Sequence, residues 1–275
     1  MINKHFVPKQ RATMSEATES EKMFERYLNG QNLAWDRVPE TQLKQPDYRV
    51  EHNRKPCFFE VKEFSDPATK PVGAFSSCPA IQEKLTQARK QFRDYRNYCC
   101  AVVLWNSKSI YRTLLLDTVA SGAFGKYVTV DADPAQDLGA NPPRFRYSGP
   151  AELSENENTT ISAIVILAPY RLNHLWLEMW RIVKTKHNQG KEITPWVQFD
   201  ILQRLSSERA PSLSYEGTIR VIVIENPFAR IPFPPDLFVG PFDQRWRMES
   251  AWLSLSFVGS ELAKLKDTGV PFIYL

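Results

Sequence analysis

Residues 46–64, PDYRVEHNRKPCFFEVKEF, hold the pattern that decides the fold of this 275-residue chain. Residues 47–50 and 57–64 are rich in aromatic and apolar side chains, which is typical of strands. The polar connection between them, which contains Asn53 and Pro56, indicates a tight turn. The stretch therefore predicts a hairpin of two antiparallel strands.

Charged side chains lie inside this apolar hairpin. Side chains two positions apart in a strand share a face, so Glu60 and Lys62 point together and Glu63 points away. Asp47, at the start of the preceding strand, comes beside Glu60 across the hairpin. Two neighbouring carboxylates repel each other unless a cation lies between them, and Mg²⁺, a hard ion that takes oxygen ligands, suits such a pair. Lys62 is then placed to position or deprotonate a water, or to neutralise developing negative charge.

The segments around the hairpin predict an α/β domain with a mixed sheet. Residues 15–33 show helical spacing of apolar side chains, and residues 33–38 predict a first strand. After the hairpin, residues 79–96 predict a second helix and residues 100–106 a buried strand. The order is helix, three strands, helix, strand, which differs from an alternating doubly wound domain.

These residues and this order resemble the PD-(D/E)xK nuclease superfamily. Pro46 and Asp47 match the PD of its motif, Glu60 and Lys62 match the (D/E)xK, and the resemblance covers residues 15–110. It implies a restriction-endonuclease-like core of order α-β-β-β-α-β, extended here by a C-terminal α/β half. It also implies Mg²⁺- or Mn²⁺-dependent hydrolysis of phosphodiester bonds. The resemblance does not by itself say which nucleic acid is cut, and we expect DNA. Asp47 and Glu60 would hold the metal, and Lys62 would assist the attacking water.

The resemblance implies further site residues. Many members add a catalytic glutamate from the first helix, for which Glu25 is the best match and Glu21 the next. Some members use polar residues of the helix that follows the motif. Gln87 and Gln91 match these, with Lys84 behind them.

The second helix also carries a row of cations: Lys84, Arg89, Lys90, Arg93 and Arg96. The row is either an ordinary solvated face or a surface that contacts nucleic-acid phosphates, since phosphate contacts dominate nucleic-acid affinity. Under the second interpretation Lys90 joins Lys84, Gln87 and Gln91 as a nucleic-acid contact. Gln87 and Gln91 lie four apart on one helical face, and ordinary surface glutamines remain the alternative.

The second half of the chain continues the α/β pattern. A helix near residues 109–120 and a strand near 126–130 precede an acidic, Asn- and Pro-rich loop over 131–159. Residues 160–168 and 218–226 predict buried strands with two helices between them. A Pro-rich segment then leads into a final helix that ends near Lys266.

The domain organisation follows from these elements. We expect a flexible basic arm over residues 1–14, a nuclease core over 15–130 and an extension over 131–275 packed on it in one continuous domain. The loop at 131–159 is the best boundary, although residues 161–167 could equally extend the first sheet.

Composition limits the remaining classes. The chain is 43% hydrophobic with a net charge of +4, which allows a sizeable core and neither requires nor excludes a nucleic-acid partner. The four cysteines lack metal-ligand spacing, and no signal peptide or membrane-spanning stretch is found, so we expect a reduced, cytoplasmic protein without a membrane partner. A homodimer is left open. The lack of a Gly-rich phosphate loop argues against a nucleotide-binding domain.

Two other functions stay open at this stage. A non-catalytic nucleic-acid-binding protein could keep the nuclease fold, and an interaction protein could use Trp176, Trp180 and the Pro-rich segment as a partner surface. Metal binding between Asp47 and Glu60 separates the enzyme from the first. The second predicts oligomerisation and no salt-dependent affinity for DNA.

Overall fold

A single mixed sheet organises the computed structural model. The structure describes residues 16–39, 44–64, 79–106, 116–131, 144–148, 151–169, 219–249 and 252–260, with the short pieces 182, 185–186, 189–190, 201 and 263. Within them the strands are, in sheet order, β1 (Ala34–Arg37), β2 (Tyr48–His52), β3 (Lys55–Phe64), β4 (Cys99–Asn106), β7 (Ala163–Pro169), β8 (Ile219–Glu225), β9 (Gln244–Glu249), β10 (Trp252–Val258), β6 (Arg144–Ser148) and β5 (Lys126–Asp131). The predicted α/β class with a mixed sheet is confirmed.

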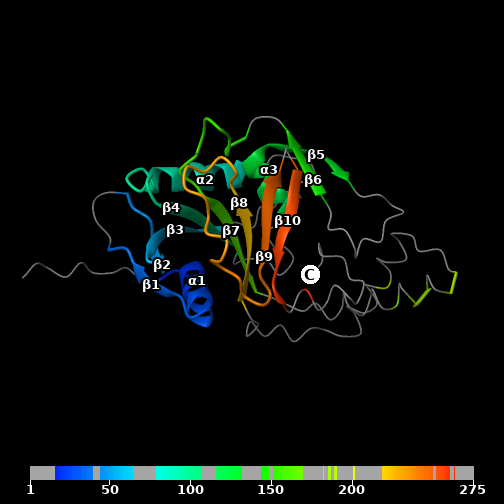
Figure 1. The fold of residues 1–275 in the computed structure, drawn as a ribbon, viewed down its shortest axis with the longest axis horizontal. Helices are drawn as coiled ribbons and strands as arrows, with labels where there is room; N and C mark the ends of the chain where they lie inside the picture. The colour runs from blue at the N-terminus through cyan, green and yellow to red at the C-terminus, as the bar shows by residue number, and fades with distance from the viewer. Residues whose placement is uncertain are drawn as a thin grey trace, which may run out of the picture.

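Helices cover both faces of this sheet (Figure 1). Helix α1 (Glu19–Gly30) packs on one face, and helices α2 (Pro79–Gln91) and α3 (Leu116–Phe124) pack on the other. No helix in the described part of the chain is long and apolar enough to cross a bilayer.

Helix α1 begins with a capping box. The Thr18 side chain accepts a hydrogen bond from the Glu21 backbone N–H at 3.3 Å, and Glu21 Oε2 accepts one from the Thr18 backbone N–H at 2.6 Å. Two backbone donors at the helix start are thereby satisfied. The helix ends at Gly30, as predicted, and its apolar stripe is buried against the sheet: Met23, Phe24, Tyr27 and Leu28.

Strands β2 and β3 form the predicted hairpin. His52 pairs with Lys55, and the two residues between them, Asn53 and Arg54, have φ values of 49° and 62°. Positive φ at both central positions is the geometry of a type I′ turn, whose twist matches that of the flanking strands. β3 then runs parallel to β4, with α2 in the connection between them.

The alternation along β3 divides its side chains between two cores. Phe59 packs in the core beneath α1, whereas Phe58 packs in the core beneath α2. Glu60 and Lys62 therefore face α2, as the period-two pattern predicts. The β4 partner of Glu60 in the sheet register is Val102, itself a member of the core beneath α2.

The second half of the chain joins the same sheet. β7 pairs in parallel with β4, so residues 161–167 extend the first sheet, which was one of the two predicted arrangements. β8 pairs antiparallel with β7, and β9 runs parallel to β8.

Several predicted elements differ from the structure. The final helix, predicted to follow Trp246, is wrong over residues 247–249 and 252–258, which belong to β9 and β10. Apolar side chains there alternate with polar ones along much of each strand. The loop at 131–159 contains the short strand β6. Helix α2 ends at Gln91 and is followed by turns, whereas the sequence predicted a helix to residue 96.

Other predictions fall outside the described residues. These are the basic arm over residues 1–14, most of the two helices predicted between β7 and β8, the side chains of Trp176 and Trp180, and the end of the chain near Lys266.

Candidate active site

The hairpin and α2 bring the motif residues together. Lys62 Nζ donates a hydrogen bond to Glu60 Oε1 at 2.5 Å, and Gln91 Nε2 donates to the same oxygen at 3.3 Å. Asp47 Oδ2 accepts a hydrogen bond from the Val61 backbone N–H at 2.7 Å. The Val61 N–H lies beyond Tyr48–Phe59, the last residue pair of the β2–β3 ladder. The Asp47 carboxylate accepts its hydrogen bond where a backbone carbonyl of the neighbouring strand would otherwise do so.

Burial opposes the negative charge of both carboxyl groups. Glu60 is 1% exposed, and this burial raises its pKa, while Lys62 acts in the opposite direction. Burial, and next the charge of Glu60, raise the pKa of Asp47 to about 7. A carboxyl pair held in this way keeps a proton near neutral pH unless a cation replaces it.

Two buried oxygen atoms of the cluster have no hydrogen-bond partner. They are Glu60 Oε2 and Gln91 Oε1, whereas buried polar atoms in proteins are normally satisfied. Both are acceptors, so an ionised carboxylate cannot satisfy them. A proton shared by Asp47 and Glu60 can satisfy the Glu60 oxygen, whereas a hard cation can satisfy both oxygens, because Mg²⁺ prefers oxygen ligands.

Few side chains at this site could act as metal ligands. The described residues contain no group of three or more His, Cys, Asp or Glu side chains that could hold a metal ion. Asp47 and Glu60 supply two carboxylates, and Gln91 supplies an amide oxygen. Mg²⁺ fits such a set because it is commonly held by one or two carboxylates and keeps several waters.

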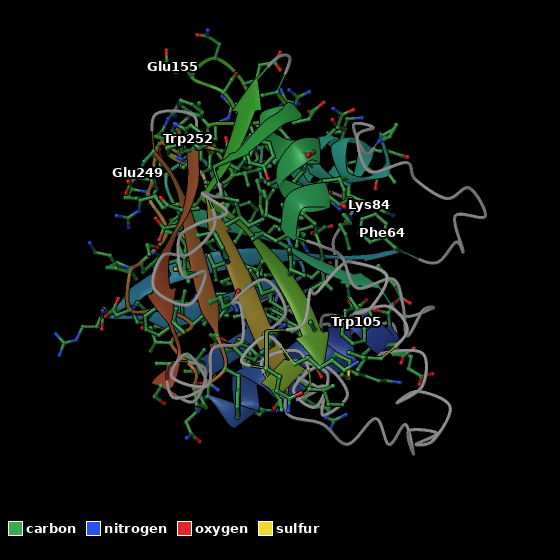
Figure 2. All side chains as sticks on the ribbon, turned by 90° about the vertical axis from the view of Figure 1, so that its right-hand side faces the viewer. Phe64, Lys84, Trp105, Glu155, Glu249 and Trp252 are labelled. Atoms are coloured by element: carbon green, nitrogen blue, oxygen red, sulfur yellow. The ribbon has the colours of Figure 1, made fainter. Side chains whose placement is uncertain are left out.

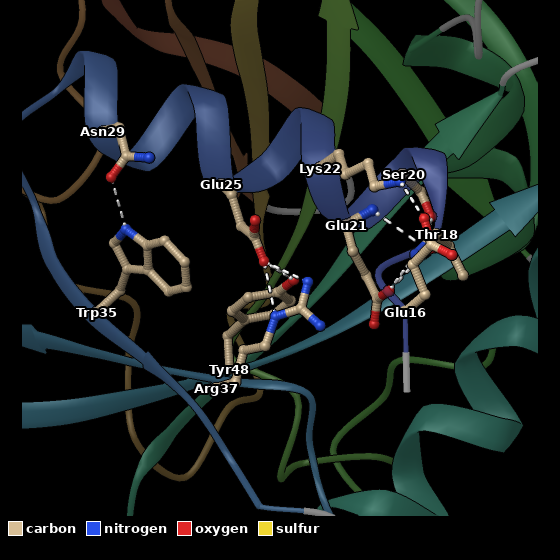
Figure 3. Close-up of polar contacts among 10 residues, drawn as sticks. All are labelled: Glu16, Thr18, Ser20, Glu21, Lys22, Glu25, Asn29, Trp35, Arg37 and Tyr48. Atoms are coloured by element: carbon tan, nitrogen blue, oxygen red, sulfur yellow. Dashed lines mark hydrogen bonds and ion pairs between the residues drawn. The ribbon is translucent and has the colours of Figure 1, made fainter. Parts of the chain in front are cut away.

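Glu25 is placed elsewhere. Its Oε1 accepts hydrogen bonds from Arg37 Nε at 2.7 Å and from the Tyr48 hydroxyl at 2.8 Å (Figure 3). Tyr48 belongs to the core beneath α1, so Glu25 lies on the opposite face of the sheet from Glu60. In the structure Glu25 links α1 to β1 and β2 through these hydrogen bonds, and it does not lie beside Asp47 and Glu60.

Glu21 has the closer electrostatic relation to the site. Its charge is among the causes that raise the pKa of Asp47, although a smaller one than burial and Glu60. Its carboxylate is held by Thr18 in the capping box at the start of α1 (Figure 3). Of the two glutamates that the resemblance suggested, Glu21 is the one that influences Asp47.

The remaining predicted contacts lie along α2. Lys84 Nζ lies 5.9 Å from the centroid of the Phe64 ring (Figure 2), and Phe64 shares the strand face of Glu60 and Lys62. Gln87 Nε2 donates to Glu83 Oε1 at 2.9 Å, an interaction within the exposed face of the helix. Lys90 is exposed and lines a cavity beyond the far end of the helix.

Comparison with protein-family models found no match, and neither the curated proteins nor the solved structures gave one.

One further group of residues escaped prediction from the sequence. The cavity that Lys90 lines is completed by Asn158, Thr159, Thr160 and Arg230. These come from the segments before β7 and after β8, and no local sequence signal connects them with α2. The parallel pairing of β7 with β4 brings them to the end of that helix.

Proposed function

We propose that this chain is a metal-dependent nuclease that hydrolyses phosphodiester bonds in DNA. The observation that carries the proposal is the pair of buried oxygens, Glu60 Oε2 and Gln91 Oε1, left without partners in a cluster that also holds Asp47 and Lys62. A divalent cation accounts for all of these features at once.

The arrangement of elements supports a restriction-endonuclease-like core. The order α1-β1-β2-β3-α2-β4, with β3 and β4 parallel and adjacent, is the order that the sequence resemblance implies. Asp47 directly precedes β2, and Glu60 lies in the middle of β3, on the sheet face that the following helix covers.

Each residue has a distinct role in the proposed reaction. Asp47 and Glu60 hold Mg²⁺ or Mn²⁺, and Gln91 both steadies Glu60 and offers its own amide oxygen. When bound, the ion polarises a phosphoryl oxygen and makes its water more acidic. The Val61 N–H fixes one oxygen of Asp47 and leaves the other for binding. Lys62 keeps a positive charge beside the carboxylates, where it orients the attacking water or neutralises charge on the phosphate.

A cleavage assay tests the proposal. Plasmid, linear and single-stranded DNA, and a single-stranded RNA, are incubated with the protein in Mg²⁺ or in EDTA. We expect DNA cleavage in Mg²⁺ alone, and a loss on the order of 10²-fold or more in Glu60→Gln, which keeps an oxygen for Lys62 but removes the charge. Glu63→Gln is the matched control, because Glu63 lies beside Trp105 in the register, on the α1 face of the sheet, and should leave cleavage unchanged.

Three outcomes would contradict the proposal. Cleavage that survives EDTA or Glu60→Gln would remove the metal site from the reaction, and cleavage of RNA alone would overturn the substrate. DNA binding without cleavage would favour the non-catalytic protein. That alternative draws on one observation: the Lys62 contact already neutralises Glu60 without a metal.

A further inference from the structure

A basic cavity lies at the end of α2. Its volume is about 340 Å³, and it is lined by Arg89, Lys90, Arg93, Arg96, Asn158, Thr159, Thr160 and Arg230. Five of these eight residues are cations, and none is acidic. The backbone N–H of Arg230 donates to the Thr159 carbonyl at 2.7 Å, which fixes the segment after β8 against the one before β7.

The five cations have no ion-pair partner within the part of the chain that the structure describes. Other cations there are paired: Arg37 with Glu25, Lys62 with Glu60, and Arg247 with Glu225. Like charges gathered around one cavity repel each other, and a bound anion relieves the repulsion. The cavity is therefore suited to an anion.

An independent observation comes from Asn158. This residue is 6% exposed, lines the cavity, and its Oδ1 is buried without a hydrogen-bond partner. Its Nδ2 is already used, since it donates to the Glu152 carbonyl. The free oxygen needs a donor, which a backbone phosphodiester group itself lacks. A base amino group, a sugar hydroxyl or a water carried by the ligand provides one.

We propose that this cavity is a second phosphate-binding site, and that it takes a backbone phosphate of a nucleic-acid strand at a distance from the Asp47–Glu60 pair. The cations bind the phosphate, and Asn158 accepts a hydrogen bond from the adjoining nucleotide or its water. The choice of nucleic acid as the source of the phosphate rests on the proposed function.

Two features favour a strand over an enclosed small molecule. Arg89, Lys90, Arg93 and Arg96 are all exposed, so a long polyanion can reach them from solvent. The same helix serves both sites, because Lys90 precedes Gln91, whose amide contacts Glu60. A strand held at the cavity is thereby presented to the metal site, and guanidinium groups suit this task because they bind phosphate in a bidentate manner.

The test measures binding separately from cleavage. Anisotropy of a labelled DNA oligonucleotide is recorded in EDTA at salt concentrations between about 50 and 200 mM. The variant Arg93→Ala/Arg96→Ala removes two exposed cations of the cavity. The control Lys22→Ala/Arg26→Ala makes the same change of net charge on α1, on the opposite face of the sheet (Figure 1).

We expect the cavity variant to weaken DNA binding about tenfold or more and to lower the slope of log affinity against log salt by about two, while the control changes little. Equal effects in the two double variants, or no effect in either, would overturn the site. Binding is recorded in EDTA, where no cleavage is expected, so this result does not depend on whether the proposed catalysis holds.

Pyrophosphate distinguishes the source of the phosphate. We expect it to compete with the oligonucleotide only weakly, since it lacks the base, the sugar and the run of phosphates that a strand offers. If pyrophosphate stabilises the protein against thermal unfolding through Arg93 and Arg96 while DNA affinity is unchanged in the cavity variant, the ligand is a free phosphorylated compound. That result would overturn the assignment to nucleic acid.

Discussion

Asp47 is held where the surrounding protein opposes its charge. Burial and Glu60 both act against ionisation, and the Val61 N–H and Lys62 only partly compensate. An arrangement of this kind lowers the stability of the metal-free protein, and such strain is common at sites that bind or react.

This destabilisation predicts a pH-dependent effect of Asp47→Asn. The ordinary pKa of an aspartate is 3.8, and that of Asp47 in the folded protein is about 7, so between these values the folded state binds more protons than the unfolded state. The free energy of unfolding therefore falls as pH rises from about 4 to 7 and is level above. Asparagine keeps an acceptor for Val61 and lacks the charge. We expect Asp47→Asn to be more stable than the unaltered protein at pH 8, on the order of 2 kcal/mol, with no gain near pH 4.

Chemical denaturation in EDTA at the two pH values measures this difference. Asp36→Asn is the control, because Asp36 is an exposed aspartate on β1 whose contact with Arg49 is 4.0 Å long, and its removal should matter little. A variant Asp47→Asn that is less stable than the unaltered protein at pH 8 would show that the charge is stabilising.

Individual residues also show how much of the candidate site could be predicted from the sequence. Period-two alternation was enough to place Glu60 and Lys62 together and Glu63 on the other face, because that rule is local. The hydrogen-bond partners of a glutamate on a helix can lie on other elements, so the neighbouring sequence does not reveal them. Glu25 is drawn to Arg37 and Tyr48, and only the packed position of α1 on the sheet reveals this.

At the scale of elements, α1 depends on its capping box. Thr18 satisfies the Glu21 N–H, and the Glu21 carboxylate satisfies the Thr18 N–H. Because the helix also carries Glu25, which ties it to β1 and β2, a weakened helix start should loosen the hairpin strand that bears Asp47.

Thr18→Ala should therefore destabilise the protein by about 1 kcal/mol, the usual effect of losing an N-cap side chain. Thr18→Ser keeps the hydroxyl and should be close to the unaltered protein. Thermal or chemical unfolding of the three proteins measures the effect. A Thr18→Ser variant as unstable as Thr18→Ala would show that the methyl group, and not the hydrogen bond, matters.

The elements that the sequence missed have a common physical reason. β9 and β10 contain charged and polar residues between apolar ones, as in QRWRME, where Trp246 and Met248 are buried and Arg247 is exposed. A short strand of this kind owes its stability to pairing with β8 and with its neighbour. Such pairings join segments that are distant in the sequence, so the strand propensity of a short segment does not predict them.

At the scale of the whole molecule, the sheet separates two surfaces. Helices α1 and α2 lie on opposite faces (Figure 1). The α1 face carries ordinary packing and paired charges, whereas the α2 face carries the carboxylate cluster and, at the end of the helix, the basic cavity. The continuous sheet explains why a cavity needs both halves of the chain: α2 belongs to the first half, and Asn158 and Arg230 to the second.

The central claim is that Asp47 and Glu60 together hold a divalent cation. Isothermal titration of the metal-free protein with Mn²⁺ tests it most directly, with Asp47→Asn and Glu60→Gln as site variants and Glu63→Gln as the control. We expect a single saturable binding event in the unaltered protein and in Glu63→Gln, weakened about tenfold or more in each site variant. No binding to the unaltered protein, or binding in Asp47→Asn or Glu60→Gln as tight as in the unaltered protein, would contradict the account.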